Sequence, residues 1–209
     1  MAITTYTELK TAVANWLARS DLTTLIPDFI TLTESEFQRT IRDRRMVTTT
    51  DLTTSASTAT VALPADFLEA RTLILQTTPY VTLKYKSPGQ LNRDFSSVSD
   101  TGKPSCYTII GSNLKLGKVP DAAYTVELEY YQKIPVLSGS NADNWLLLAY
   151  PDIYLFGALQ HAGFYTKNDR LVTVANAGLQ RGLGSLAEES NRAMWGGGPL
   201  TTSVDVTTA

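Results

Sequence analysis

The sequence predicts an α+β protein: helices from both ends of the chain form an α-helical bundle, and an antiparallel β domain is inserted between them. Two changes of pattern predict this class. Apolar residues recur at helical spacing in the first and last parts of the chain, whereas the middle shows alternation and frequent turn residues. After Trp195 the sequence becomes rich in glycine and threonine, which predicts an extended C-terminal tail. The expected divisions are 1–46, 47–136, 137–195 and 196–209.

Composition excludes several classes of protein. With 209 residues, of which 43% are hydrophobic and 18% charged, the chain can bury a core as one or two domains. A net charge of −2 does not favour a protein that grips nucleic acid through its phosphates. Cys106 is the only cysteine, which excludes an internal disulfide and a cysteine-based zinc site and fits a reducing cytoplasm. The start of the sequence lacks the basic and apolar pattern of a signal peptide.

The first helix is expected to begin at Tyr6. Thr5 and Glu8 have the spacing of a capping box, in which each side chain binds a free backbone N–H of the first turn. Helical spacing then predicts one core face, made of Leu9, Ala12, Val13 and Trp16.

A second, amphipathic helix is expected to open at Pro27 and to end near Arg42. Proline suits a first helical turn, and cations favour the partial negative charge at a helix C-terminus. One stripe is apolar and contains Ile30, Thr33, Phe37 and Ile41. The basic residues at its end are Arg39, Arg42, Arg44 and Arg45.

The inserted segment is expected to form a small antiparallel sheet or barrel. Its clearest strand is 124–131, where apolar and polar residues alternate. Residues 107–110 and 114–116 flank a short loop, 111–113, which predicts a hairpin. Further strands are expected at 47–54, 58–63 and 69–76, a short helix after Ser87-Pro88, and a surface loop at 96–103.

Residues 144–165 contain the densest apolar and aromatic segment and predict buried helix. We expect a short helix over 144–149 and a longer one from Tyr150, because Pro151 suits a first turn. The Pro151-Asp152 pair interrupts an apolar run that is shorter than the ~20 residues a bilayer requires, so no membrane span is expected. The helical core is predicted to include Trp16, Phe37, Trp145, Leu148, Leu155 and Leu159.

A last helix is expected to follow the cap Asn168. Gly178, Gly182 and Gly184 would each destabilise it by roughly 1 kcal/mol relative to alanine. We therefore expect them to permit the close approach of a neighbouring backbone. The inner side of this helix is predicted to hold Leu171, Val174, Gly178, Leu179, Gly182 and Leu186.

The residues that could carry catalysis favour structural interpretations. His161 is the only histidine, so histidine-based triads and multi-histidine metal sites have no second partner, and we expect a packing role. Glu34, Glu36 and Asp43 could supply paired carboxylates for glycan cleavage. At positions i and i+2, however, Glu34 and Glu36 diverge around a helix, which favours a solvated face. No cofactor and no metal site is predicted.

Three other motifs leave alternatives open. Gly196 to Gly198 lack the strand and the Lys-Ser/Thr of a phosphate loop, so they predict a hinge. The four arginines could line a DNA channel, but helix capping or salt bridges between subunits explain them equally well. Tyrosines 124, 130 and 131 could form a carbohydrate platform, although alternating aromatic residues on a strand usually pack across strands.

Motifs along nearly the whole chain carry a family resemblance. They are Tyr6-Thr7-Glu8-Leu9, Leu63-Pro64-Ala65-Asp66-Phe67, Tyr107-Thr108-Ile109, Trp145 followed by Pro151-Asp152, and Trp195-Gly196-Gly197-Gly198-Pro199-Leu200. In this order and spacing, the chain resembles the head-to-tail adaptor proteins of tailed bacteriophages.

The resemblance implies a structural protein of the virion and no enzyme. Such adaptors form a ring, commonly of twelve copies, beneath the portal, extend the DNA channel and attach the tail or nozzle. Double-stranded DNA passes through the lumen without specific binding, and assembly takes place in the host cytoplasm without a membrane. The resemblance also implies that the tail grips the portal through Trp195, Gly196, Gly197, Gly198, Pro199, Leu200, Val204 and Val206.

Two alternatives to the structural role stay open. One is a cell-wall glycan hydrolase carried in the virion, with Glu34 or Glu36 as the acid. The other is a sugar-binding tail module whose function lies in the β insertion alone.

Overall fold

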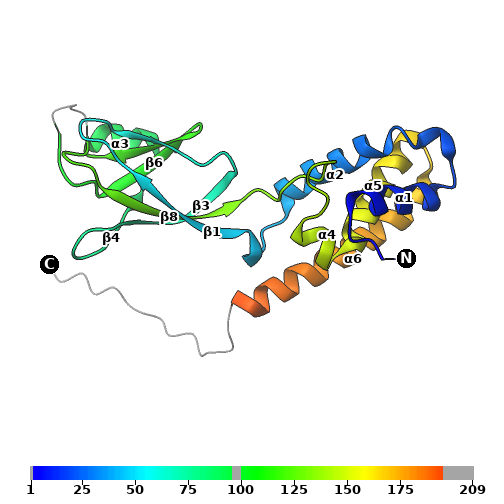
Figure 1. The fold of residues 1–209 in the computed structure, drawn as a ribbon. Coiled ribbons are helices and arrows are strands. Elements are labelled where there is room, and N and C mark those ends of the chain that lie inside the picture. The colour runs from blue at the N-terminus through cyan, green and yellow to red at the C-terminus, as the bar shows by residue number, and fades with distance from the viewer. Residues whose placement is uncertain (1, 96–99, 195–209) are drawn as a thin grey trace. The chain divides into compact units, whose positions relative to one another are not determined.

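The computed structural model describes residues 2–95 and 100–194, and these form two compact units (Figure 1). The helical unit combines the described residues up to Arg44 with those from Ile134 onward, and the β unit comprises Arg45–Lys133. The α+β class is confirmed. The tail expected over 196–209, together with Trp195 before it, lies outside the described residues.

The helical unit is organised around one helix, α5. It packs against α1, α2 and α6, so it is apolar on nearly every side and buries residues all around its axis (Figure 1). A short 3₁₀ turn, Ser20–Leu22, lies between α1 and α2. The helices are α1 (Tyr6–Leu17), α2 (Ile26–Thr40), α4 (Trp145–Ala149), α5 (Pro151–Thr166) and α6 (Asp169–Met194).

Local signals set several helix ends as expected. The Thr5 hydroxyl accepts the Glu8 N–H at 3.3 Å, and the Glu8 carboxylate accepts the Thr5 N–H at 3.0 Å, so the capping box is present. Asn144 caps α4 by accepting the N–H of Leu147 at 2.8 Å. Pro151 is the first residue of α5, where its missing N–H removes no helical bond.

Glycines permit close packing of α5 against α2 and α6. A Cβ on Gly157 would lie 2.3 Å from Thr33 Cγ2 of α2, and one on Gly178 would lie 2.6 Å from the Phe156 ring. A Cβ on Gly182 would lie 2.8 Å from Ile153 Cγ1. The neighbours are therefore side chains and not the backbone that was expected. Gly184 differs, because nothing lies within 4 Å of its missing Cβ.

The predicted helical core needs two corrections. Phe37, Leu155 and Leu159 are buried and Trp145 is half-buried, but Trp16 is 56% exposed and Leu148 is 55% exposed. Trp16 lies in the last turn of α1. Leu148 lies in a helix of five residues whose buried side chains are the two before it, Leu146 and Leu147. On α6, Val174 was also expected inside and is 53% exposed.

The β unit contains two four-stranded sheets, in the orders β1-β8-β3-β4 and β2-β7-β6-β5. The chain changes sheets four times, between β1 and β2, β2 and β3, β4 and β5, and β7 and β8. A short helix, α3 (Pro88–Asp94), packs against β6. The strands are β1 (Val47–Thr53), β2 (Thr60–Ala62), β3 (Phe67–Leu75), β4 (Val81–Thr82), β5 (Lys84–Tyr85), β6 (Cys106–Ile110), β7 (Asn113–Gly117) and β8 (Thr125–Gln132).

Two details of the predicted sheet were wrong. β5 pairs with β6 in parallel, whereas all pairs were expected to be antiparallel. The hairpin loop is also shorter than 111–113, because β7 already begins at Asn113. Gly111 has a φ of 59°, a left-handed conformation that favours glycine in a two-residue hairpin turn. Both sheets contribute to one core: Leu52, Leu73, Leu75, Leu83, Tyr107, Leu114, Leu116, Val126, Leu128 and Tyr130.

Candidate functional site

The glutamate considered as a catalytic acid is a buried structural group. Glu34 is only 6% exposed, so the prediction of a solvated face was wrong for this residue. Its Oε1 accepts the N–H of Leu137 at 2.8 Å and the hydroxyl of Tyr154 at 3.3 Å. Burial raises the pKa of Glu34, although both hydrogen bonds oppose this effect. Burial also raises the pKa of Tyr154 well above its ordinary value.

The same network binds residues 134–137, the segment by which the chain returns from the β unit to the helical unit. Asn144 Nδ2 donates to the Tyr154 hydroxyl at 2.7 Å and to the carbonyl of Pro135 at 2.8 Å. One turn after Glu34, the Gln38 side chain donates to the carbonyl of Ile134 at 2.6 Å and accepts its N–H at 3.0 Å. These bonds satisfy backbone groups that neither a helix nor a strand would satisfy, so their role is structural.

Glu36 and Asp43 do not complete a catalytic pair with Glu34. The Glu36 carboxylate is 37% exposed and lies 3.5 Å from His161 Nε2, whereas Glu34 points toward Tyr154 and Leu137. Asp43 is buried, at 3% exposure. A glycosidase needs two carboxyl groups on either side of one open sugar site, and these residues do not provide it.

The arginines near the end of α2 differ in their local surroundings. Arg42 Nη1 donates to the carbonyls of Gln38 and Ile41, at 3.1 and 2.7 Å, and so caps the end of α2. Arg39 lies in the last turn of the helix and is exposed. Arg44 is the last residue of this part of the helical unit, whereas Arg45 begins the β unit.

An exposed groove, lined mainly by apolar residues, lies over α5 between α1 and α6. It has a volume of about 410 Å³. Phe156 of α5 meets the Trp16 ring of α1 edge-on, with centroids 5.9 Å apart. We call this surface the α1/α6 groove. The residues that line the groove are Trp16, Phe156, Val174, Ala177, Gly178 and Arg181.

A second cavity, of about 400 Å³, lies beside the last turn of α2. Gly184 lines it, which is consistent with the open space over its missing Cβ. Its lining is partly polar and includes Thr40, Arg42 and Gln180. Neither Glu34 nor Glu36 lines this cavity.

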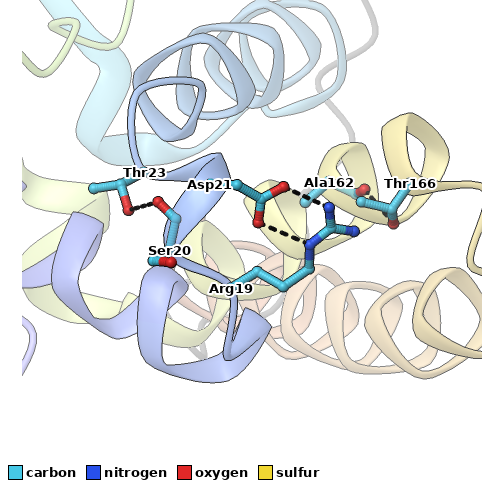
Figure 2. A network of polar contacts seen from close by, with 6 residues as sticks. All are labelled: Arg19, Ser20, Asp21, Thr23, Ala162 and Thr166. Carbon is cyan, nitrogen blue, oxygen red and sulfur yellow. Dashed lines mark hydrogen bonds and ion pairs between the residues drawn. The ribbon is translucent and has the colours of Figure 1, made fainter.

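The turn between α1 and α2 is held by local polar contacts, as Figure 2 shows. The Arg19 guanidinium donates to both carboxylate oxygens of Asp21, at 3.0 and 2.5 Å, and these bonds lower the pKa of Asp21. Thr23 donates to the carbonyl of Ser20 at 2.9 Å. Both partners of the ion pair are more than half exposed, so the pair fixes the turn and adds little stability.

The tyrosines considered as a sugar platform are used for packing and local bonds. Tyr130 is 4% exposed, stacks on Phe67 and donates to Asp66, and burial with this bond raises its pKa to about 12. Tyr124 donates to Asp121 at 2.7 Å. Tyr131 faces the guanidinium of Arg71, 5.5 Å from the ring centre. The three side chains therefore do not present one aromatic surface.

Two further properties concern the described ranges only. Within residues 2–95 and 100–194, no cluster of three or more His, Cys, Asp or Glu side chains could hold a metal ion. In the same ranges, no helix has the length and apolar character that a bilayer crossing requires. The proposed portal-binding residues, from Trp195 to Val206, lie outside these ranges.

Comparison with known families decides the identity. The family model of the SU10 adaptor protein matches residues 4–203. The chain belongs to the SU10 adaptor protein family. These proteins are phage head–tail adaptors, so the resemblance drawn from the sequence is confirmed. A comparison with curated proteins gives no match.

Membership of the SU10 adaptor family makes the chain a structural component of the head–tail region that interacts with other phage head or tail proteins. The surfaces that could meet those proteins are therefore candidate sites. The sequence did not identify Phe156, Ala177 and Arg181 as parts of one site. Phe156 lies on α5 and the other two on α6, and the spacing within either helix gives no sign of a shared groove. The one available signal was Trp16, a large side chain at the very end of a short helix.

Proposed function

We propose that this SU10 adaptor forms a closed ring beneath the portal, extends the DNA channel and provides the attachment site for the tail. Twelve copies are the expected number. The observation that carries the proposal is an exposed apolar groove on the helical unit of a family whose members join head to tail. Apolar side chains that gather in an exposed groove suit the binding of a partner.

The internal bonding of the helical unit supports a scaffold role. α5 is buried between three helices, and Glu34, Asn144 and Tyr154 form a buried polar network. A ring component has to keep its shape while DNA and partner proteins load it, and this buried network favours that. Glu34 belongs to this network and Glu36 lies beside His161, so no observation favours the hydrolase.

We also propose that double-stranded DNA passes the ring without specific binding. The net charge of −2 gives no large electrostatic attraction for phosphates. A conduit through which DNA must slide functions best without tight contacts. Assembly in the host cytoplasm, without a membrane, follows from the same role.

The C-terminal tail, 196–209, is proposed to grip the portal. Its sequence supplies the reason: three glycines are followed by Pro199-Leu200 and by Val204 and Val206 at alternate positions. Such a segment suits strand addition to a partner's sheet edge, where backbone hydrogen bonds supply the affinity. Each tail would bind weakly, but a ring engages many tails at once.

Binding to heads tests this proposal. The full chain and a chain lacking 196–209 are each incubated with purified heads that carry the portal and lack the adaptor, and bound protein is measured by co-sedimentation. The full chain is expected to co-sediment, whereas the shortened chain stays in the supernatant with an unchanged circular dichroism spectrum. A full chain that does not bind heads contradicts the proposed function. A shortened chain that binds as well as the full chain places the portal contact elsewhere.

A further inference from the structure

The α1/α6 groove combines an apolar floor with one charged margin. Trp16 and Val174, on opposite walls, are 56% and 53% exposed, and Phe156 lies between them. Gly178 has no side chain, so the Phe156 ring packs directly against α6 and forms the floor of the groove. Arg181 stands one turn beyond Ala177 on the same wall. The groove therefore suits an apolar side chain with an acidic neighbour.

The outer side of α2 has the complementary arrangement. Leu32 is 52% exposed, although the next residue, Thr33, packs into α5 at Gly157. Asp28 lies one turn before Leu32 on the same helix face, and Glu36, whose carboxylate lies beside His161, lies one turn after it. This face is called the Leu32 ridge below.

The groove and the ridge lie on different sides of the helical unit. Gly157 of α5 packs against Thr33 of α2. Phe156 is turned by about 100° from Gly157 around α5 and forms the floor of the groove. One copy cannot bring its own ridge into its own groove, because both helices are fixed against α5. A second copy can.

We propose that the Leu32 ridge of one copy occupies the α1/α6 groove of the next, with Leu32 above Phe156 and Asp28 facing Arg181. The occupant is thus a second copy of this chain. Within the part of the chain that the structure describes, neither Asp28 nor Arg181 has an ion-pair partner of its own. Opposite charges across the contact fix its register.

The contact is head-to-tail, because it joins two different patches. Head-to-tail contacts of this kind close into rings when the rotation between subunits permits it. The inference rests on the proposed ring and adds to it the two surfaces that meet between subunits.

Cysteine cross-linking tests the contact directly. Leu32→Cys and Ala177→Cys are made in separate chains, mixed and oxidised; the native Cys106 is 2% exposed, so the wild-type chain serves as the blank. We expect the mixture to give a cross-linked dimer and a chain carrying both substitutions to give a ladder of larger species. The matched control is Leu32→Cys with Thr11→Cys, an exposed position on α1 that is turned by about 140° from Trp16. Cross-linking no faster than this control overturns the proposal.

Charge reversal gives a second test at two exposed positions. Asp28→Arg or Arg181→Asp alone should weaken self-association about tenfold, and both changes in one chain should restore most of it. Analytical ultracentrifugation measures the association, and circular dichroism checks the fold. A double variant that associates no better than the weaker single variant overturns the contact.

These results are separable from the test of function. If Leu32→Glu chains still form rings on portal-bearing heads, the adaptor role stands and the proposed contact is wrong. If Trp16→Ala abolishes binding to heads while no cross-link forms, another phage protein occupies the groove and the proposal is also wrong. If the wild-type chain fails to bind heads, the function fails whatever the cross-links show.

Discussion

Glu34 Oε1 accepts the backbone N–H of Leu137 at 2.8 Å, a bond between residues 103 positions apart. The entire β unit lies between them in sequence. The bond ties α2, after which the chain leaves the helical unit, to the segment by which it returns. Gln38 and Ile134 make a second connection of the same kind. These bonds join the two parts of the helical unit that the β unit separates in sequence.

Removing this carboxylate should destabilise the helical unit. Glu34→Ala leaves the buried Leu137 N–H without its acceptor, which costs about 1–3 kcal/mol. The matched control is Glu36→Ala, two residues away, whose partly exposed pair with His161 should contribute less than about 1 kcal/mol. Urea unfolding followed by circular dichroism measures both. Equal losses of stability in the two variants would show that the Glu34 network is not a structural tie.

Glu34 should also make stability depend on pH. Burial raises its pKa above the ordinary value of 4.5, so the folded chain retains a proton there after the unfolded chain has lost it. The contribution of Glu34 is therefore fully present below pH 4.5 and is lost as pH rises through the raised pKa. Glu34→Gln should flatten the fall in the urea midpoint above pH 4.5. An unchanged slope would contradict the assignment.

Two aromatic residues predicted for the core should behave differently. Phe37 is 1% exposed and meets the Tyr154 ring edge-on at 5.3 Å, so Phe37→Ala should destabilise the chain by about 3–5 kcal/mol. Trp16 is 56% exposed, so Trp16→Ala should lower stability much less and act mainly on self-association. Urea unfolding and sedimentation velocity separate the two effects. A large loss of stability in Trp16→Ala would instead show that Trp16 is part of the core.

Two glycines on α6 give a matched pair. Gly184→Ala adds a Cβ that meets nothing within 4 Å, so it should stabilise the helix by about 0.5–1 kcal/mol. Gly182→Ala places a Cβ 2.8 Å from Ile153 Cγ1 and should destabilise the fold by about 1–3 kcal/mol. Thermal unfolding of the two variants tests the packing of α5 against α6. The same sign of change in both would contradict it.

Much of the fold could be predicted because its signals are local. The Thr5–Glu8 capping box, Pro151 at the start of α5 and the alternation in β8 each follow from residues within one turn or one strand. The short strands β4 and β5, of two residues each, have no such pattern. Their pairing depends on partners far along the chain, so the sequence did not show the parallel pair.

The burial of side chains was harder to predict where it depends on contacts between residues distant in sequence. Helical spacing places Trp16 on the same face as Leu9 and Val13, but it cannot show that the core ends one turn earlier. Helical spacing also predicted that Glu34 faces solvent. Its partner, the N–H of Leu137, is distant in sequence, so the spacing could not reveal this bond. The groove joins three helices, and its residues come together only when α5 is in place.

Electron cryomicroscopy of portal-bearing heads incubated with the purified chain tests the central claim most directly. The heads lack their own adaptor, and heads without a portal serve as the control. The account predicts a closed ring of this SU10 adaptor on the axis of the portal vertex, and none on the control heads. Absence of density at that vertex, or binding spread over the capsid surface, would contradict the account.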